Sequence, residues 1–263
     1  MTQRLCVVFE WPNPMTATVR GTVRGMANRA NPAFAVGAVA IPVLALVYVL
    51  QWGNRPQHIY VHVMAGVLWT GIDLFMAMVL GPVLGGLAVE ERANVFQRFT
   101  PKMTFLMPTL ALVTIAGGIT LALRLEVFSN AQPWLALFTA ASLLPAIILI
   151  GWQFDAFRDW RWLAVFAVVL VGSGGYLAAT LPAFAMTEPS IAVALGIVTV
   201  LSVLGFGVLL PGEVRMYREM VSENPDTDVI SNIGMRNAKL SGIQGLFQLA
   251  VIVVMVWIRW GNL

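Results

Sequence analysis

The sequence predicts an all-α membrane protein, a polytopic bundle of seven transmembrane helices. Of its 263 residues, 59% are hydrophobic and only 11% are charged, against about 45–50% apolar and about 25% charged in an ordinary soluble domain. The 16 Lys and Arg and 13 Asp and Glu gather in a few short segments. The chain between these segments carries almost no charge. These two observations exclude a soluble globular fold.

Each helix follows from a window that is nearly free of charge. Crossing about 30 Å of hydrocarbon takes about 20 residues at a rise of about 1.5 Å each, and every window reaches that length. Only the second window is broken, by Asp73. In chain order, the predicted helices cover 34–52, 58–84, 103–123, 133–153, 162–184, 190–212 and 240–258. They make up a transmembrane domain over 34–263.

The segments outside the helices predict the orientation. With a cytoplasmic N-terminus, all Lys and Arg except Arg55, Arg124 and Arg259 lie inside, as the positive-inside rule requires. The N-terminus is therefore predicted inside and the C-terminus outside, in the cytoplasmic membrane. Residues 1–33 are expected to form a basic cytoplasmic arm, with a disordered arm favoured over a helix on anionic headgroups. Residues 213–239 are expected to form the main cytoplasmic loop, with a short helix from Glu213 to Val221.

Partners follow from the same charges. The net charge of +3 is explained by topology, so no nucleic acid is predicted. The lipid bilayer is the predicted environment, and the loop 213–239 is the predicted place for a protein partner. Cys6 is the single cysteine, which excludes an intrachain disulfide and a cysteine-cluster metal site.

The second predicted helix carries both histidines and the one carboxylate inside a span. A carboxylate near the middle of the bilayer costs about 2.5–3.5 kcal/mol on insertion scales, so Asp73 is expected to face the bundle interior. Two interpretations stay open: Asp73 lies on a proton relay or ion pathway, or it makes an interhelical hydrogen bond that fixes packing. Gln244 and Gln248 are the named polar candidates for partners.

The two histidines suggest a metal site. His58 and His62 are four residues apart, so both imidazoles lie on one helix face and can converge on one ion. Met186 is the suggested third ligand, since imidazole and thioether together suit Cu(I). The alternative is that both histidines belong to the polar belt at the membrane surface. Haem b would need His62 with an axial ligand such as Met186, because two histidines on one helix face point the same way.

A short motif in this helix resembles a known family. The run His62-Val-Met-Ala-Gly66-Val-Leu-Trp69-Thr-Gly71 resembles the His-x3-Gly-x2-Trp-x-Gly helix of copper-resistance-D-like (CopD-like) membrane proteins. The following Arg98-Phe-Thr-Pro-Lys-Met segment and the Gly117-Gly118 pair are similar too, so the resemblance covers 58–123. It implies a bundle in the cytoplasmic membrane that handles copper, or in other members haem or redox partners. Further histidines and Met-rich loops of such proteins are missing here.

Three functions are therefore predicted as alternatives. The first is copper or other metal-ion handling, or small-solute transport, through a site on the second helix, with Gly66, Trp69 and Gly71 as packing positions. The second is a non-catalytic subunit or assembly factor of a membrane complex. The third is a haem-associated membrane redox protein. The chain shows no Ser/His/Asp or Cys/His set, so no catalytic residue is predicted.

Overall fold

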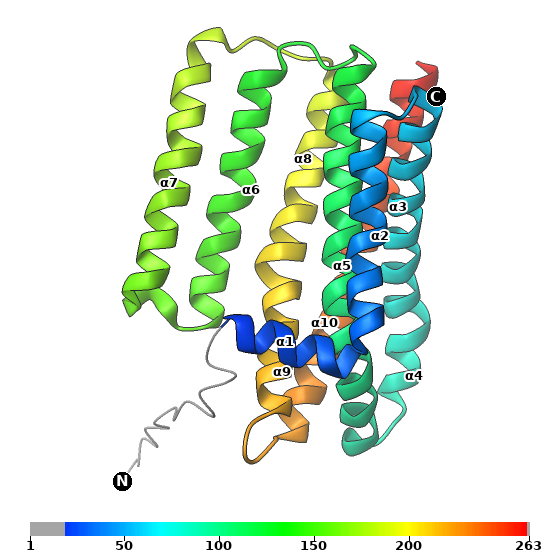
Figure 1. The fold of residues 1–263 in the computed structure, drawn as a ribbon, viewed down its shortest axis with the longest axis vertical. Helices are drawn as coiled ribbons and strands as arrows, with labels where there is room; N and C mark the ends of the chain where they lie inside the picture. Colours follow the sequence, from blue (N-terminus) through cyan, green and yellow to red (C-terminus); the bar gives the residue numbers. More distant parts are fainter. Residues whose placement is uncertain (1–18, 262–263) are drawn as a thin grey trace.

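The computed structural model describes residues 19–261, which form helices and no strand. Figure 1 shows long helices that run side by side, with one short helix lying across one end. In chain order they are α1 (Val19–Ala30), α2 (Pro32–Gln51), α3 (Arg55–Phe75), η1 (Met76–Leu80), α4 (Gly81–Gly85), α5 (Val89–Arg124), α6 (Ala131–Gln153), η2 (Ala156–Arg158), α7 (Trp160–Thr180), η3 (Leu181–Ala183), α8 (Pro189–Leu204), η4 (Gly205–Leu209), α9 (Leu210–Met220) and α10 (Thr227–Trp260).

The predicted number of membrane spans is confirmed. Seven helices, or continuous runs of helices, are long and apolar enough to cross a membrane. They cover Pro32–Gln51, Arg55–Gly85, Val89–Arg124, Ala131–Gln153, Trp160–Ala183, Pro189–Met220 and Thr227–Trp260. The chain is a multi-pass membrane protein whose apolar helix faces contact lipid.

Local signals fix where these helices begin and end. Asn54 and Gln57 form a reciprocal cap at the start of α3, in which each side chain accepts a hydrogen bond from the other residue's backbone N–H. At the start of α10, Asp226 accepts from the backbone of Asp228 and Val229. Arg124 donates to the carbonyls of Val49 and Gly53. This cation therefore satisfies the free carbonyls at the end of α2.

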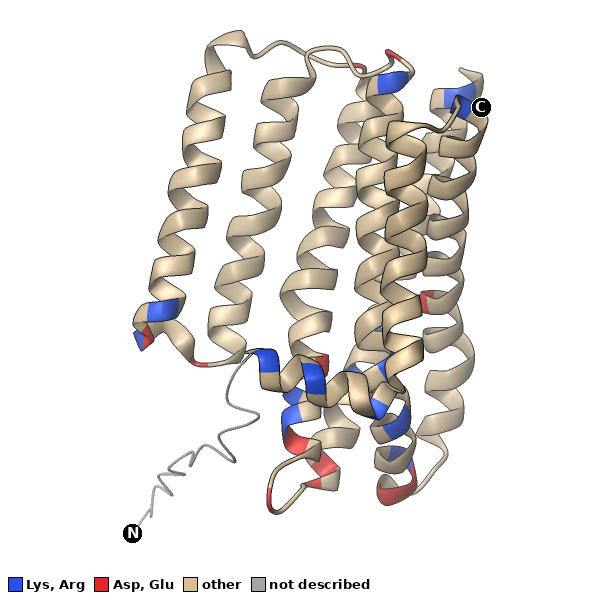
Figure 2. Cartoon of the chain, in the orientation of Figure 1, with Lys and Arg blue, Asp and Glu red and all other residues tan. Residues whose placement is uncertain are grey.

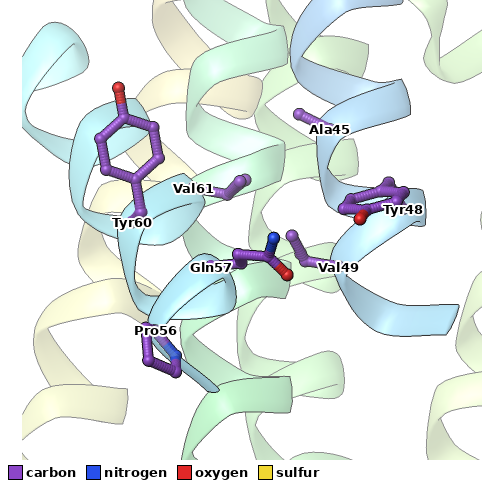
Figure 3. A pocket seen from close by; sticks show the side chains of 7 residues that line it. All are labelled: Ala45, Tyr48, Val49, Pro56, Gln57, Tyr60 and Val61. Atoms are coloured by element: carbon purple, nitrogen blue, oxygen red, sulfur yellow. The ribbon is translucent and has the colours of Figure 1, made fainter. Parts of the chain in front are cut away.

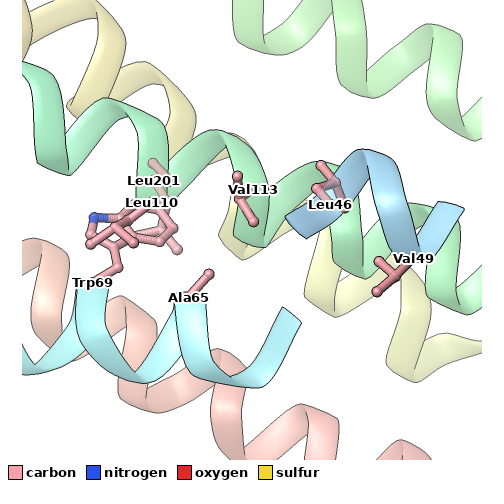
Figure 4. Close-up of a cluster of buried hydrophobic side chains, with 8 residues drawn as sticks. Leu46, Val49, Ala65, Trp69, Leu110, Val113 and Leu201 are labelled. Atoms are coloured by element: carbon pink, nitrogen blue, oxygen red, sulfur yellow. The ribbon is translucent and has the colours of Figure 1, made fainter. Parts of the chain in front are cut away.

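The core of the bundle lies where α3 and α5 meet, flanked by α2, α8 and α10. Trp69 is 3% exposed and packs with Leu110 of α5 and Leu201 of α8; Figure 4 shows the three side chains together. Leu46 and Val49 extend the same cluster from α2. The helix α7 lies at the edge against α6, with Ser173 its one buried residue among those described.

The predicted loop 213–239 is mostly helical in the structure, and its expected short helix from Glu213 to Val221 corresponds to the end of α9. Residues up to Met220 belong to α9, and α10 begins at Thr227, so the connection covers only 221–226. The helix α5 likewise begins at Val89 and not at 103. Hydropathy marks only the part of a helix that lies in hydrocarbon, whereas these helices continue beyond it and bury an apolar stripe. One buried apolar cluster at this end of the bundle consists of Leu84, Ala93, Phe96, Met216, Met220, Ile230 and Ile233.

The predicted disordered arm is also wrong where the structure describes it. Residues 19–30 form α1. The first part of the predicted arm, residues 1–18, lies outside the described residues. Thr22, Met26 and Ala30 repeat at intervals of four and are buried, which anchors one face of α1 on the bundle. Arg20 and Arg24 are exposed. The helix lies across the end that carries α9.

The charges gather at the two ends of the bundle (Figure 2). Among residues 19–261, every Lys and Arg except Arg55, Arg124 and Arg259 belongs to segments of the end that carries α1 and α9. We call this end the basic end. The positive-inside rule predicts that this end faces the cytoplasm, and the orientation stays a prediction.

The contact between α10 and α5 at the basic end allows a test of the fold. A Cβ on Gly234 would lie within 2.6 Å of the Phe96 ring, so we expect Gly234→Ala to lower stability by about 1–3 kcal/mol. The measurement is the thermal unfolding midpoint of the detergent-purified protein. Gly172→Ala is the matched control, because a Cβ on Gly172 would meet no described atom within 4 Å. An unchanged midpoint for Gly234→Ala would contradict this packing.

Candidate functional site

Asp73 is the centre of the candidate site. Its side chain is 0% exposed and projects from the last turn of α3. Its Oδ2 accepts hydrogen bonds from Nε2 of Gln244 and from Nε2 of Gln248, each at 2.8 Å. Both glutamines belong to α10, so the two partners predicted from the sequence are confirmed. The carboxyl group thereby joins α3 to α10 inside the bundle.

The helix α10 presents a polar stripe to this carboxyl group. Asn237, Ser241, Gln244 and Gln248 are spaced by four, three and four residues, so they lie on one helix face. All four are less than a tenth exposed. The sequence prediction named only the two glutamines, although the 3.6-residue period was enough to add Asn237 and Ser241.

A cavity of about 70 Å³ lies beside Asp73. One water needs about 10–15 Å³ by this measure, so the cavity has room for several waters. Its polar lining consists of Asp73, Glu213, Asn237, Ser241 and Gln244. The remaining lining is apolar and includes Trp69, Phe99, Phe206, Met76, Met103 and Met107, and it contains no Lys, Arg or His. The cavity therefore contains two carboxyl groups and no basic group.

Glu213 is the residue that sequence reasoning missed. The sequence predicts it in the cytoplasmic loop, because its charge follows the uncharged window of the sixth span. In the structure the helix continues through Pro211 and Gly212 into α9, and this carries Glu213 onto the cavity. Thr104 of α5 lies beside its carboxyl group. The sequence does contain a signal for this helix: apolar residues recur at helical spacing from Leu209 to Met220.

Two π-helical turns flank the cavity. η1 begins three residues after Asp73, and η4 ends four residues before Glu213. In each, a backbone N–H bonds five residues back: Gly81 to Met76 and Leu210 to Gly205. Such turns widen the helix locally and are frequent at functional sites. Asn237 donates to the carbonyl of Leu209 in η4 at 3.2 Å, so α10 holds this irregular turn in place.

Several oxygen atoms in this region accept no hydrogen bond. Within residues 19–261, the buried Oδ1 of Asp73, Oε1 of Gln244 and Oδ1 of Asn237 have no partner. Unpaired buried acceptors cost about 1–3 kcal/mol each, so such groups normally take a water, a proton or a cation. All three residues line the cavity. The site is thus an acceptor-rich pocket inside the membrane bundle, with two carboxyl groups and no basic group in its lining.

The two histidines form a separate feature at the opposite end of α3. His58 donates from Nε2 to the carbonyl of Gly117 at 3.1 Å, and His62 donates from Nδ1 to the carbonyl of Thr114 at 2.9 Å. Because a carbonyl only accepts, these ring nitrogens carry the protons. The other nitrogen of each ring keeps its lone pair. Gly118 leaves room for the His62 ring, which a Cβ there would meet at 2.8 Å.

Met186, the suggested third ligand of the metal site, lies in the segment between η3 and α8. Met186 is 69% exposed, and its carbonyl accepts from Asn130, just before α6, whereas the histidines contact α5. No group of three His, Cys, Asp or Glu that could hold a metal occurs among the residues described. The prediction of copper at His62 and His58 stays a prediction.

The three motif positions behave differently. A Cβ on Gly66 would meet Thr114 at 3.3 Å, so Gly66 allows the close approach of α3 and α5. Trp69 is buried in the core. Gly71 is exposed, and a Cβ there would meet no described atom within 4 Å. The predicted packing role of Gly71 is therefore wrong, because the residue faces away from the bundle.

A second cavity, of about 340 Å³, lies between α2 and α3 (Figure 3). Tyr48 and Tyr60 line it with Val49, Val61 and Gln57. Its lining has no charged group, and tyrosines at this depth are typical of the membrane–water boundary. This cavity offers much less chemistry than the one beside Asp73.

Comparison with known proteins does not identify the chain. No protein-family model matches it, and neither a curated protein nor a solved structure is significantly similar to it. The class that the fold and site define is a multi-pass helical membrane protein with a buried, acidic cavity. The CopD-like resemblance stays a prediction.

The Asp73 network gives a quantitative prediction. Gln248→Leu removes one of the two donors to Asp73 Oδ2, and we expect it to lower stability by about 1 kcal/mol. The measurement is the unfolding midpoint in detergent. The matched control is the same substitution in an Asp73→Leu background, where the acceptor is missing and its effect should disappear. Equal effects in both backgrounds would contradict a direct bond between the two side chains.

Proposed function

We propose that this protein moves a proton or small cation across the membrane, or couples that movement to a solute, with Asp73 as the ion-binding group. The single observation that carries the proposal is the cavity that places Asp73 and Glu213 together without a basic residue in its lining. Carboxyl groups inside membrane spans mark ion pathways and proton relays in many transporters.

The alternative of a purely structural hydrogen bond explains less. Packing of α3 on α10 needs only a polar pair, and neutral Ser, Thr, Asn and Gln side chains supply such pairs between membrane helices. An Asp73 carboxyl group adds an insertion cost of about 2.5–3.5 kcal/mol. A structural bond also gives no reason for a second carboxyl group, a cavity and two π-helical turns at the same place.

The proposal predicts ion flux that depends on Asp73. We expect the wild-type protein, reconstituted in lipid vesicles, to speed the entry of protons or of ²²Na⁺ under a valinomycin-driven potassium potential. A pH-sensitive dye trapped in the vesicles reports protons, and filtration reports ²²Na⁺. Asp73→Asn keeps the shape of the side chain but removes its charge, so it should reduce the flux at least tenfold.

Glu188→Gln is the matched control, because Glu188 is an exposed carboxylate at the start of α8. Its flux should equal that of the wild type. Flux of neither ion above that of empty vesicles, or a flux that Asp73→Asn leaves unchanged, would contradict the proposal.

Copper binding at the histidine pair is a second candidate function. It is favoured by the hydrogen bonds of the rings, since a metal-binding imidazole commonly directs its other N–H to a backbone carbonyl, as His58 and His62 do. We expect His62→Ala to lower the Cu(I) stoichiometry of the purified protein, and Met186→Ala to leave it unchanged. Equal stoichiometry in wild type and His62→Ala would contradict copper binding at this pair.

Further proposals concern a haem cofactor, a protein partner and the location of the protein. Haem b bound through His62 and a role as non-catalytic subunit or assembly factor are alternatives without a supporting contact in the described residues. The cytoplasmic membrane is the proposed location, on the strength of the basic end. A protein partner would meet the connection 221–226 and the helix ends beside it, since Met216, Tyr217, Met220, Ile230 and Ile233 are buried.

A further inference from the structure

We propose that the cavity beside Asp73 binds one monovalent alkali cation, with Glu213 as a second carboxylate on its route from the basic end. The proposal deepens the proposed function, because it names the ion and the donor atoms of that same site. It rests on the arrangement of oxygen atoms in two tiers along α10.

The upper tier is the binding site itself. Asp73 offers Oδ1, since both glutamines donate to its Oδ2. Gln244 offers its unpaired Oε1, and the Ser241 hydroxyl lies beside the Asp73 carboxyl group. Ser241 and Gln244 are three residues apart on one face of α10, and both line the cavity beside Asp73. The tier is lined by oxygen donors, which are the ligands of hard cations.

The lower tier lies nearer the basic end. Asn237 is one turn below Ser241, about 6 Å along the helix axis. Its amide group packs against Gly212, where a Cβ would meet Oδ1 at 2.9 Å, and Glu213 is the next residue. The buried Oδ1 of Asn237 has no partner among the described residues. Both side chains line the same cavity as Asp73.

The charge of the site favours a single positive charge over two. Only one oxygen of Asp73 is unpaired, and its neighbours in the upper tier are neutral. Sites for Ca²⁺ and Mg²⁺ rely on several carboxylate oxygens or on retained water and phosphate ligands. Cu(I) would prefer the methionines of the lining, but the unpaired groups are oxygen atoms and not thioethers. Glu213, one tier away, adds attraction without completing a divalent site.

The test is equilibrium binding of ²²Na⁺ to the purified full-length protein in detergent, at constant ionic strength set with choline chloride. We expect saturable binding of about one ion per chain, which unlabelled NaCl or KCl displaces and choline does not. Asp73→Asn should abolish binding. Glu213→Gln should weaken it about tenfold, because it removes a carboxyl group that lines the same cavity as Asp73.

Glu223→Gln is the matched control, since Glu223 is an exposed carboxylate in the connection 221–226, and its affinity should equal that of the wild type. Ser241→Ala, expected to weaken binding, replaces Asp73→Asn if the latter does not fold. Absence of saturable ²²Na⁺ binding by the wild type overturns the proposal. Two other results would also overturn it. One is that Ca²⁺ or Cu(I) displaces ²²Na⁺ and KCl does not. The other is that Glu213→Gln and the wild type bind ²²Na⁺ with equal affinity.

The binding and flux experiments test the cation site and the transport function independently. If ²²Na⁺ binds as expected but vesicles show no flux, the cation site holds and the proposed transport function fails. If vesicles conduct protons through Asp73 but the protein binds no ²²Na⁺, the transport function holds and the alkali-cation site fails.

Discussion

The arrangement of this bundle depends on placing one carboxyl group away from lipid. In hydrocarbon every polar group must find an internal partner, and Asp73 finds two amide donors on α10. That requirement fixes which face of α3 turns inward and sets the register of α10 against it. Trp69 lies one turn before Asp73 on the same inward face and packs the core. The histidines, further along that face, bond to α5.

The same constraint explains the irregular backbone around the site. The helix widens by one π-helical turn after Asp73, at η1, and by another before Glu213, at η4. Both turns lie beside the cavity. Irregular backbone at membrane depth is tolerated where it is buried in protein or lines an aqueous cavity. The Asn237 amide, which donates to Leu209, supports one of these turns. The two carboxyl groups and the two π-helical turns therefore lie at the same cavity.

The sequence predicted the number of spans, the inward face of Asp73 and its two glutamine partners, because the energetic cost of a charge in lipid is large and local to one residue. It did not predict helix ends in water, where packing rather than hydropathy extends α5 and α10. Nor does it predict Glu213 in the site, since the charge of Glu213 lies just beyond the uncharged window that predicts the sixth span. Neither π-helical turn has a sequence signal, because each arises from tertiary contacts.

Cation binding at Asp73 is tested most directly by an infrared difference spectrum of the protein in lipid, recorded on exchange of choline for Na⁺. A cation on Asp73 changes the environment of its carboxylate, so we expect a difference band in the carboxylate stretching region. This band should be missing in Asp73→Asn and kept in Glu223→Gln. A spectrum without any carboxylate band, or a band that persists in Asp73→Asn, would contradict cation binding at this site.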